Sequence, residues 1–143
     1  VLDDEGKKVR LVAGALYGMR APVDVYSDTV YADIALNAGA KLPVPAEIEE
    51  RALYPVHGCL EIGGQVYDPG QLLILKPGDE ITVKAMEDAR IMLLGGAAMD
   101  GERHIWWNFV SSRRERIEQA MEDWREGRFT GVPGETEFIP LPQ

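Results

Sequence analysis

The chain has 143 residues, of which 45% are hydrophobic and 27% are charged, and a chain of this size buries the core of one ordinary globular domain. Its 24 acidic and 15 basic residues give a formal net charge of −9, which argues against direct nucleic-acid binding, because phosphate backbones attract clustered lysines and arginines. No apolar run reaches the roughly 18 residues of a membrane-spanning helix, and the start of the chain has no apolar stretch typical of a signal peptide.

The first hundred or so residues predict short β-strands separated by glycine and proline turns. Residues 29–39 alternate between apolar and polar positions, and one face is formed by Val30, Ala32, Ile34 and Leu36. A period of two residues is typical of a strand with one face in the core. Residues 59–68 predict a hairpin, because Gly63–Gly64 supplies the positive φ angles of a tight turn between two apolar runs.

Two further segments extend this pattern. Residues 70–85 predict two strands around a turn at Pro77–Gly78–Asp79, and residues 89–96 form a last apolar run. Many short strands with closely spaced turns favour an all-β sandwich or barrel.

The C-terminal part of the chain changes to a helical period. Ser112 and Glu115 fit a capping box, and apolar residues follow at helical spacing: Ile117, Ala120, Met121 and Trp124. With Gly127 as the stop, the pattern predicts one amphipathic helix at about residues 112–126.

Residues 104–110, HIWWNFV, predict one strand with large aromatic side chains on both faces. His104, Trp106 and Asn108 would share one face, and Ile105, Trp107 and Phe109 the other. Core and helix packing is expected to account for most of these aromatics. An interdomain or subunit contact is expected for the remainder, with the candidate interface residues His104, Trp106, Trp107 and Trp124.

The proline-rich residues 127–143 predict an extended tail. Three apolar side chains in this tail are available for docking on a surface: Phe138, Ile139 and Leu141. The tail and residues 93–129 also resemble known proteins.

Residues 93–129, LLGGAAMDGERHIWWNFVSSRRERIEQAMEDWREGRF, and the following VPGETEFIPLP resemble the C-terminal end of bacterial pirin-family proteins. The earlier segment YADIALNAGAKLPVPAEIEERALYPVHGCLEIGG resembles the middle of the same half. The resemblance implies a cupin, a double-stranded β-helix or jelly-roll barrel, followed by one helix and an extended tail. We therefore expect a single cupin domain over residues 1–143, with its barrel at about 8–110.

Pirins are bicupins, so the resemblance also implies a second barrel that is absent from this chain. The N-terminal barrel of pirins carries the iron site, and the C-terminal barrel ordinarily has none. Some bacterial members cleave quercetin as metal-dependent dioxygenases, and eukaryotic members are iron-dependent partners of transcription factors. Because the first residue is Val1 rather than methionine, we also consider that the chain is a piece of such a longer protein.

The first cupin motif aligns without a gap from Gly39 to Gly58. Pro45 and Glu47 fall at the positions of its two histidines, and Arg51 falls at the position of its glutamate. A second-motif histidine is expected near Ile81, and residues 79–90 contain none. An iron site in such a barrel needs several imidazoles and a carboxylate around one centre, so this barrel is predicted to be metal-free.

Three alternative roles remain for the residues at and near these motif positions. Glu47, Arg51 and His57 are candidates for a small-molecule pocket, in which Arg51 meets an anionic ligand. Alternatively, Glu47 and Arg51 pair with each other and fill the cavity, since a buried charge needs a partner. A two-histidine, one-carboxylate metal site from His57, His104 and Glu47 is the third.

Cys59 is the only cysteine, which excludes a disulfide within the chain and predicts a reducing cytoplasm. A redox-sensing thiol would need a lowered pKa and exposure, and a small core hydrophobe is the favoured interpretation. The sequence shows no recognisable pattern of a catalytic triad or a phosphate-binding loop, so no catalytic residue is predicted.

Two functions follow from these observations. The first is a non-catalytic, metal-free cupin with a structural or interaction role, whose partner is a sister cupin domain or a second copy of this chain. The second is a part of a metal-dependent, quercetin dioxygenase-like enzyme, with iron or another divalent metal bound in an N-terminal cupin outside this chain.

Overall fold

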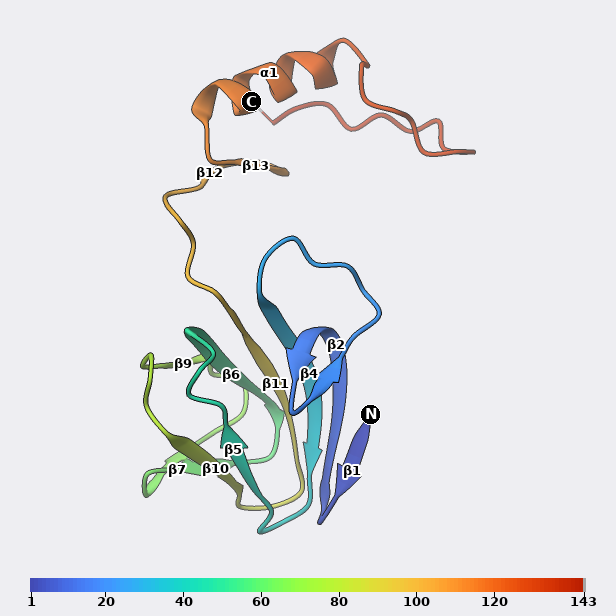
Figure 1. Ribbon diagram of the computed structural model, residues 1–143. Coiled ribbons are helices and arrows are strands. Elements are labelled where there is room, and N and C mark those ends of the chain that lie inside the picture. Colours follow the sequence, from blue (N-terminus) through green and yellow to red (C-terminus); the bar gives the residue numbers. More distant parts are fainter. Residues whose placement is uncertain (143) are drawn as a thin grey trace. The chain divides into compact units, whose positions relative to one another are not determined.

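The computed structural model describes residues 1–142, and the chain divides into two compact units, Val1–Ala98 and Met99–Gln143 (Figure 1). The first unit is built from two antiparallel sheets, and the second contains a hairpin, a helix and an extended tail. No helix in residues 1–142 combines the length and the apolar composition that crossing a membrane requires.

The larger sheet of the first unit has seven strands in the order β1-β2-β4-β11-β6-β9, with β3 paired to β2. These strands are β1 (Leu2–Asp4), β2 (Lys7–Leu16), β3 (Met19–Arg20), β4 (Thr29–Leu36), β6 (Glu50–His57), β9 (Leu73–Leu75) and β11 (Ala89–Gly96). The smaller sheet has the order β5-β10-β7-β8. Its strands are β5 (Lys41–Val44), β7 (Leu60–Ile62), β8 (Gln65–Tyr67) and β10 (Ile81–Ala85).

The core lies between these two sheets, as the period-two pattern predicted. In β4, all four predicted core residues are buried and the intervening residues are exposed or half-buried. Leu53 of β6, Leu93 of β11 and Val83 of β10 are fully buried, so both sheets contribute to one apolar interior. This two-layer arrangement confirms the all-β jelly-roll prediction.

The predicted turns are also confirmed. Gly63 and Gly64 have φ angles of 59° and 83° and connect β7 to β8, as a two-residue hairpin turn requires. Gly78, between β9 and β10, has a φ of 76°. Each turn therefore adopts a backbone conformation that glycine accepts with little strain.

The two glycines that frame the first cupin motif have the same backbone conformation but different surroundings. Gly39 has a φ of 80° and Gly58 a φ of 77°. A Cβ atom added at Gly39 would meet no heavy atom within 4 Å, whereas at Gly58 it would lie 2.6 Å from the carbonyl oxygen of Asp88. Gly58 is therefore required by close packing against the start of β11.

The second unit differs from the expected single strand at 104–110. It contains a hairpin of β12 (His104–Trp106) and β13 (Phe109–Ser111), in which Trp106 pairs with Phe109. The chain reverses at Trp107, which has a left-handed φ of 50°. A non-glycine residue in this region is strained, and the edge-on contacts of Trp107 with Phe109 and Trp124 offset that strain.

Because this hairpin belongs to the second unit, the barrel does not extend to residue 110. The last strand of the two large sheets, β11, ends at Gly96, and the first strand already begins at Leu2. The barrel was predicted at about 8–110, and the described strands of the two large sheets lie between Leu2 and Gly96.

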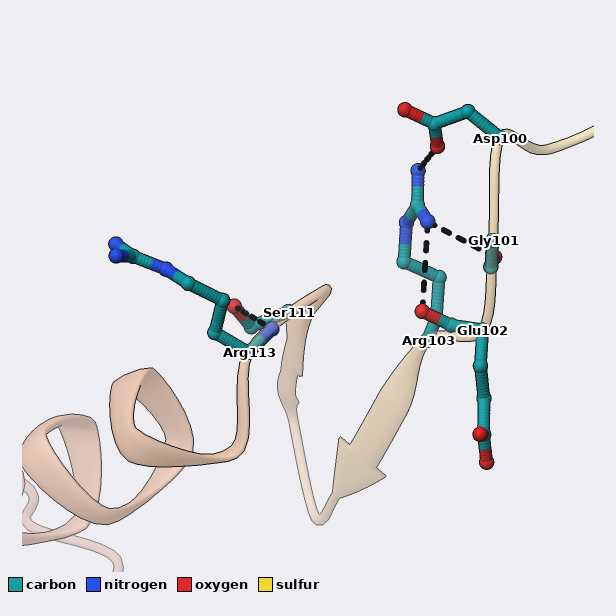
Figure 2. A network of polar contacts seen from close by, with 6 residues as sticks. All are labelled: Asp100, Gly101, Glu102, Arg103, Ser111 and Arg113. Atoms are coloured by element: carbon teal, nitrogen blue, oxygen red, sulfur yellow. Dashed lines mark hydrogen bonds and ion pairs between the residues drawn. The ribbon is translucent and has the colours of Figure 1, made fainter.

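The helix α1 (Arg114–Arg125) begins two residues later than predicted, and the capping box does not form. Its N-cap is Arg113, whose side chain makes no capping hydrogen bond. Instead, the backbone N–H of Arg113 donates to the Ser111 hydroxyl oxygen at 3.2 Å (Figure 2). The predicted end is confirmed, because Gly127 has a φ of 66° and its N–H donates to the Trp124 carbonyl oxygen.

A second local network shapes the segment before β12. The Arg103 guanidinium donates to the Asp100 carboxylate at 2.6 Å and to the Gly101 carbonyl oxygen at 2.9 Å (Figure 2). This contact holds the pKa of the Asp100 carboxyl below its usual value. The side chain of Arg103 thereby fixes the bend that leads into the hairpin.

Aromatic stacking holds the second unit together. Trp124 of α1 contacts four other aromatic rings: Trp107, Phe109, Phe129 and Phe138. Its indole N–H also donates to the Ile139 carbonyl oxygen at 2.8 Å, so the extended tail lies against the helix. Among the described residues of this unit only Ile117 is fully buried, and the aromatic cluster therefore replaces a conventional core.

The two motif glycines provide a matched test of this fold. We expect Gly39→Ala to destabilise the chain by about 1 kcal/mol, because only the left-handed backbone penalises alanine there. Gly58→Ala should cost more than about 3 kcal/mol, since the added methyl group also overlaps the Asp88–Ala89 backbone. Urea unfolding followed by far-UV circular dichroism measures both, and equal costs would contradict the close approach at Gly58.

Candidate functional site

The residue at the expected metal-ligand glutamate position, Arg51, lies inside the barrel. It is on the inward face of β6, together with Leu53 and Pro55. Its exposed fraction is 2%, and it is the one charged residue buried among the described residues 1–142. Long charged side chains are rarely buried to this extent unless their donors are satisfied.

The Arg51 guanidinium donates to four backbone carbonyl oxygens. One terminal nitrogen contacts the carbonyls of Val44 at 3.3 Å and Pro45 at 3.0 Å. The other contacts those of Lys76 at 2.6 Å and Asp79 at 2.9 Å. The first pair of oxygens lies at the end of β5 and directly after it, and the second lies between β9 and β10, so one side chain connects segments of both sheets.

This arrangement corrects the predicted ion pair between Glu47 and Arg51. Glu47 is exposed, and the hydrogen bonds of Arg51 within residues 1–142 all go to backbone carbonyl oxygens. Carbonyl dipoles stabilise a buried cation without the desolvation cost of a buried carboxylate. The Nε atom of Arg51 is buried and has no hydrogen-bond partner, which leaves one donor of the fork unused.

These residues do not fit a metal ion. A guanidinium that points into the barrel is a cation without any acceptor atom, so it cannot ligate another cation. Within residues 1–142, no group of three or more His, Cys, Asp or Glu side chains is arranged to hold a metal. In the alternative site from His57, His104 and Glu47, the first and third residues belong to the first unit and His104 to the second, so that site stays a prediction.

Of the three residues of the predicted pocket, Arg51 is buried, whereas Glu47 and His57 are exposed. His57 is exposed at the last position of β6, whereas Glu47 precedes the first position of that strand. Glu47 lines an open cavity of about 260 Å³, together with Gly14, Arg20, Asp28, Glu49 and Gly96. Neither Arg51 nor His57 is among the residues that line this cavity.

No pattern in the sequence pointed to Tyr17, which the structure places at a polar contact between the sheets. The Tyr17 hydroxyl donates to the Pro43 carbonyl oxygen at 2.6 Å. Burial of the ring, followed by the negative charge of Glu47, raises the pKa of Tyr17 to about 12. Tyr17 has a left-handed φ of 48°, and the phenol therefore acts as a neutral hydrogen-bond donor that holds a strained turn against β5.

Cys59 is half-buried, so it is neither an exposed thiol nor a residue of the core. Its Sγ lies 3.6 Å from a carboxylate oxygen of Asp68, and its backbone N–H donates to Glu87 at 3.1 Å. Desolvation, followed by the hydrogen bonds and charges of these two acids, raises the pKa of the Cys59 thiol. Because redox sensing requires a lowered thiol pKa, this environment does not support that interpretation.

The four candidate interface residues all lie in the second unit and are all half-buried. Trp107 and Trp124 contact each other edge-on, with ring centroids 5.1 Å apart. Trp106 stacks on Phe109, and His104 lies beside it in β12. Much of their aromatic surface is thus used within the unit, and their role in an external contact stays a prediction.

The two-sheet jelly roll with a glycine-framed first motif is the fold of a cupin. The profile of the "Pirin C-terminal cupin domain" matches residues 31–130. The chain belongs to this family.

Curated relatives and solved structures agree with that assignment. The chain is 42% identical to a pirin-like protein of Caulobacter vibrioides, over 99% of this chain and 49% of the relative. It is 36% identical to a Pseudomonas aeruginosa protein named "Putative quercetin 2,3-dioxygenase", over 87% of this chain and 40% of the relative. A crystal structure of quercetin 2,3-dioxygenase from Acinetobacter baumannii matches the fold with a TM-score of 0.84 at 21% identity, over 99% of this chain and 49% of that one. The chain thus spans about half the length of these relatives.

Replacing Arg51 tests its contribution to the barrel. We expect Arg51→Met to destabilise the chain by roughly 3–5 kcal/mol, because methionine fills similar space but leaves buried carbonyl oxygens without donors. Arg51→Lys should cost less, since an ammonium keeps the charge but cannot reach all four oxygens.

The matched control is Arg90→Met, at an exposed arginine whose guanidinium binds the Asp33 carboxylate at 2.8 Å. Because solvent screens an exposed pair, we expect a change close to the error of urea unfolding. Equal effects of Arg51→Met and Arg90→Met would show that the carbonyl contacts add no stability.

The raised thiol pKa predicts the pH dependence of Cys59 alkylation. The thiolate fraction at pH 8 should be smaller than that of a free cysteine, so iodoacetamide should react slowly and accelerate only at higher pH. Asp68→Asn removes one negative neighbour and should shift the rate profile to lower pH. Mass spectrometry of the modified protein gives the rates, and an unshifted profile for Asp68→Asn would contradict the assigned cause.

Proposed function

We propose that this chain is a non-catalytic, metal-free cupin of a pirin-like protein, with a structural and interaction role. The observation that carries the proposal is the Arg51 guanidinium, which occupies the interior at the glutamate position of the first cupin motif. Its hydrogen bonds to four backbone carbonyl oxygens hold the segments at this end of the barrel together.

The other two motif positions support the same function. The carbonyl of Pro45 accepts a hydrogen bond from Arg51, and its ring offers no ligand atom. The Glu47 carboxylate is exposed at the cavity next to Arg20 and Asp28. The motif glycines Gly39 and Gly58 keep their turn conformations, so the chain retains the frame of the motif without its ligands.

A second candidate function concerns a longer protein. Curated relatives are about twice as long as this chain, and one of them carries the name of a quercetin dioxygenase. If this chain is part of such an enzyme, iron or another divalent metal would be held by an N-terminal cupin outside these residues. The present chain would then support that barrel and take no part in the chemistry.

The third possibility, a small-molecule barrel around Arg51, has less support. Both terminal nitrogens of the guanidinium are already bound to carbonyl oxygens, and an anionic ligand would have to displace them. Arg51 lines neither the cavity beside Glu47 nor the one beside Tyr17. Protein–protein contact is therefore the favoured role for this half.

Metal analysis tests the proposal. The chain is expressed with added iron, manganese or nickel, dialysed, and measured by inductively coupled plasma mass spectrometry. We expect far less than one equivalent of any metal, and the same result for His57→Ala and His104→Ala. One bound equivalent that either histidine variant removes would overturn the proposal, as would quercetin cleavage by the iron-loaded chain.

A further inference from the structure

The open cavity of about 260 Å³ beside Glu47 is formed by residues of the first unit alone. Its floor crosses three neighbouring strands of the larger sheet. Gly14 of β2 pairs with Val30 of β4, and Gly96 of β11 pairs with Thr29 of β4. The floor of the cavity is therefore regular β-sheet rather than loop.

Small residues keep the space above this floor open. Gly14, Ala15, Gly96 and Ala97 all line the cavity. A Cβ atom added at Gly14 would lie 1.5 Å from the Thr29 carbonyl oxygen, so close packing of the strands excludes any side chain there. The cavity is thus a consequence of how these strands pack.

The walls of the cavity carry four charged side chains. Arg20 belongs to β3, Asp28 directly precedes β4, and Glu47 and Glu49 precede β6. All four are exposed, and three carboxylates against one guanidinium give the cavity a net charge of −2. A concave surface of one predominant charge concentrates ligands of the opposite charge.

Backbone contacts hold these charged residues in place. The Ala97 N–H donates to the Asp28 carbonyl oxygen at 3.0 Å, and the Ala98 N–H donates to the Glu49 carboxylate at 3.0 Å. Arg20 is held in the β2–β3 pair. Groups that are already positioned lose less conformational freedom when a ligand binds.

The charges at the cavity are available to a ligand. Among the ion pairs within residues 1–142, none includes Arg20, Asp28 or Glu47. The three carboxylates do not converge on one point, because no group of three such side chains in this part of the chain could hold a metal ion. A ligand with several separated charges therefore fits this cavity better than a single ion.

We infer that the cavity binds a free basic amino acid such as lysine or arginine, with its carboxylate at Arg20 and its cationic groups at the acidic side chains. Hydrogen bonds between ionised partners are the strong ones, and a guanidinium can bind a carboxylate through two of them. An acidic ligand would be repelled by the net negative charge, and a diamine would leave Arg20 without a partner.

The size of the cavity agrees with a ligand of this class. Pockets for drug-sized molecules measure about 300–1,000 Å³, and this cavity lies just below that range. The inference goes beyond the proposed function and uses neither Arg51 nor the metal argument. Ligand binding and metal content are measured separately, so either conclusion can fail alone.

Titration of the chain with L-lysine, followed by amide NMR spectra, tests the inference. A ligand of about ten heavy atoms in an open cavity is expected to bind with a dissociation constant of about 1 mM. The amide signals of Gly14, Gly96 and Ala97 should shift and saturate together. Because the contacts are ionic, about 0.5 M salt should weaken binding.

Two analogues of lysine separate the charges that carry the binding. Norleucine lacks the side-chain ammonium group, and cadaverine lacks the carboxylate. Each should bind at least about fivefold more weakly than lysine, since each loses one charge-assisted hydrogen bond. Equal affinity of lysine and norleucine would overturn the inference.

Substitutions at the walls provide the matched comparison. Glu47→Gln and Arg20→Gln should each raise the lysine dissociation constant at least about fivefold, and both residues are exposed, so the fold should be kept. The control is Glu80→Gln, at an exposed acid that does not line the cavity, and it should leave the constant unchanged.

Three further results would contradict a site for a free amino acid. The first is the absence of saturable shifts at the cavity amides with lysine. The second is a Glu47→Gln variant that binds as the original chain does, or a Glu80→Gln variant that is weakened equally. The third is tighter binding of Nα-acetyl-lysine methylamide than of lysine, which would identify a lysine side chain of a protein as the occupant.

Discussion

The buried guanidinium of Arg51 is the contact on which one end of the barrel depends. A permanent charge is stable at this depth only where oxygen atoms surround it, and four backbone carbonyls meet this requirement. Two belong to the last residue of β5 and the residue after it, and two lie between β9 and β10. Because β5 and β10 are in the smaller sheet and β6 and β9 in the larger, a single side chain fixes both layers.

That contact also explains how a cupin can retain its shape while losing its metal ligands. In this chain the Arg51 guanidinium lies in the interior, at the motif position of the metal-ligand glutamate, and backbone carbonyls surround it. The turns at Gly39 and Gly58 are preserved because they set the path of the backbone. The shape of the barrel is thus kept where the motif's ligand positions are not, which is consistent with the proposed structural role.

The two units use different means of cohesion. The first has a conventional apolar core between two sheets, with fully buried side chains such as Ile34, Leu53 and Ile91. The second has one buried residue among those described, and the four aromatic rings that contact Trp124 hold its hairpin, helix and tail together. Aromatic contacts achieve this with few residues, because each ring buries a large area and prefers defined edge or offset geometries.

The sequence by itself determined the strand now seen as β4, the glycine turns and the family. The alternation of apolar and polar residues in β4 and the Gly63–Gly64 turn depend only on neighbouring residues. Both can therefore be recognised in the sequence before the fold is known. Only the tertiary structure decided the reversal at Trp107, since its left-handed backbone depends on rings from α1 and the hairpin. It also decided the partners of Arg51: every residue type carries a carbonyl, so no sequence pattern reveals which carbonyls fold around a buried guanidinium.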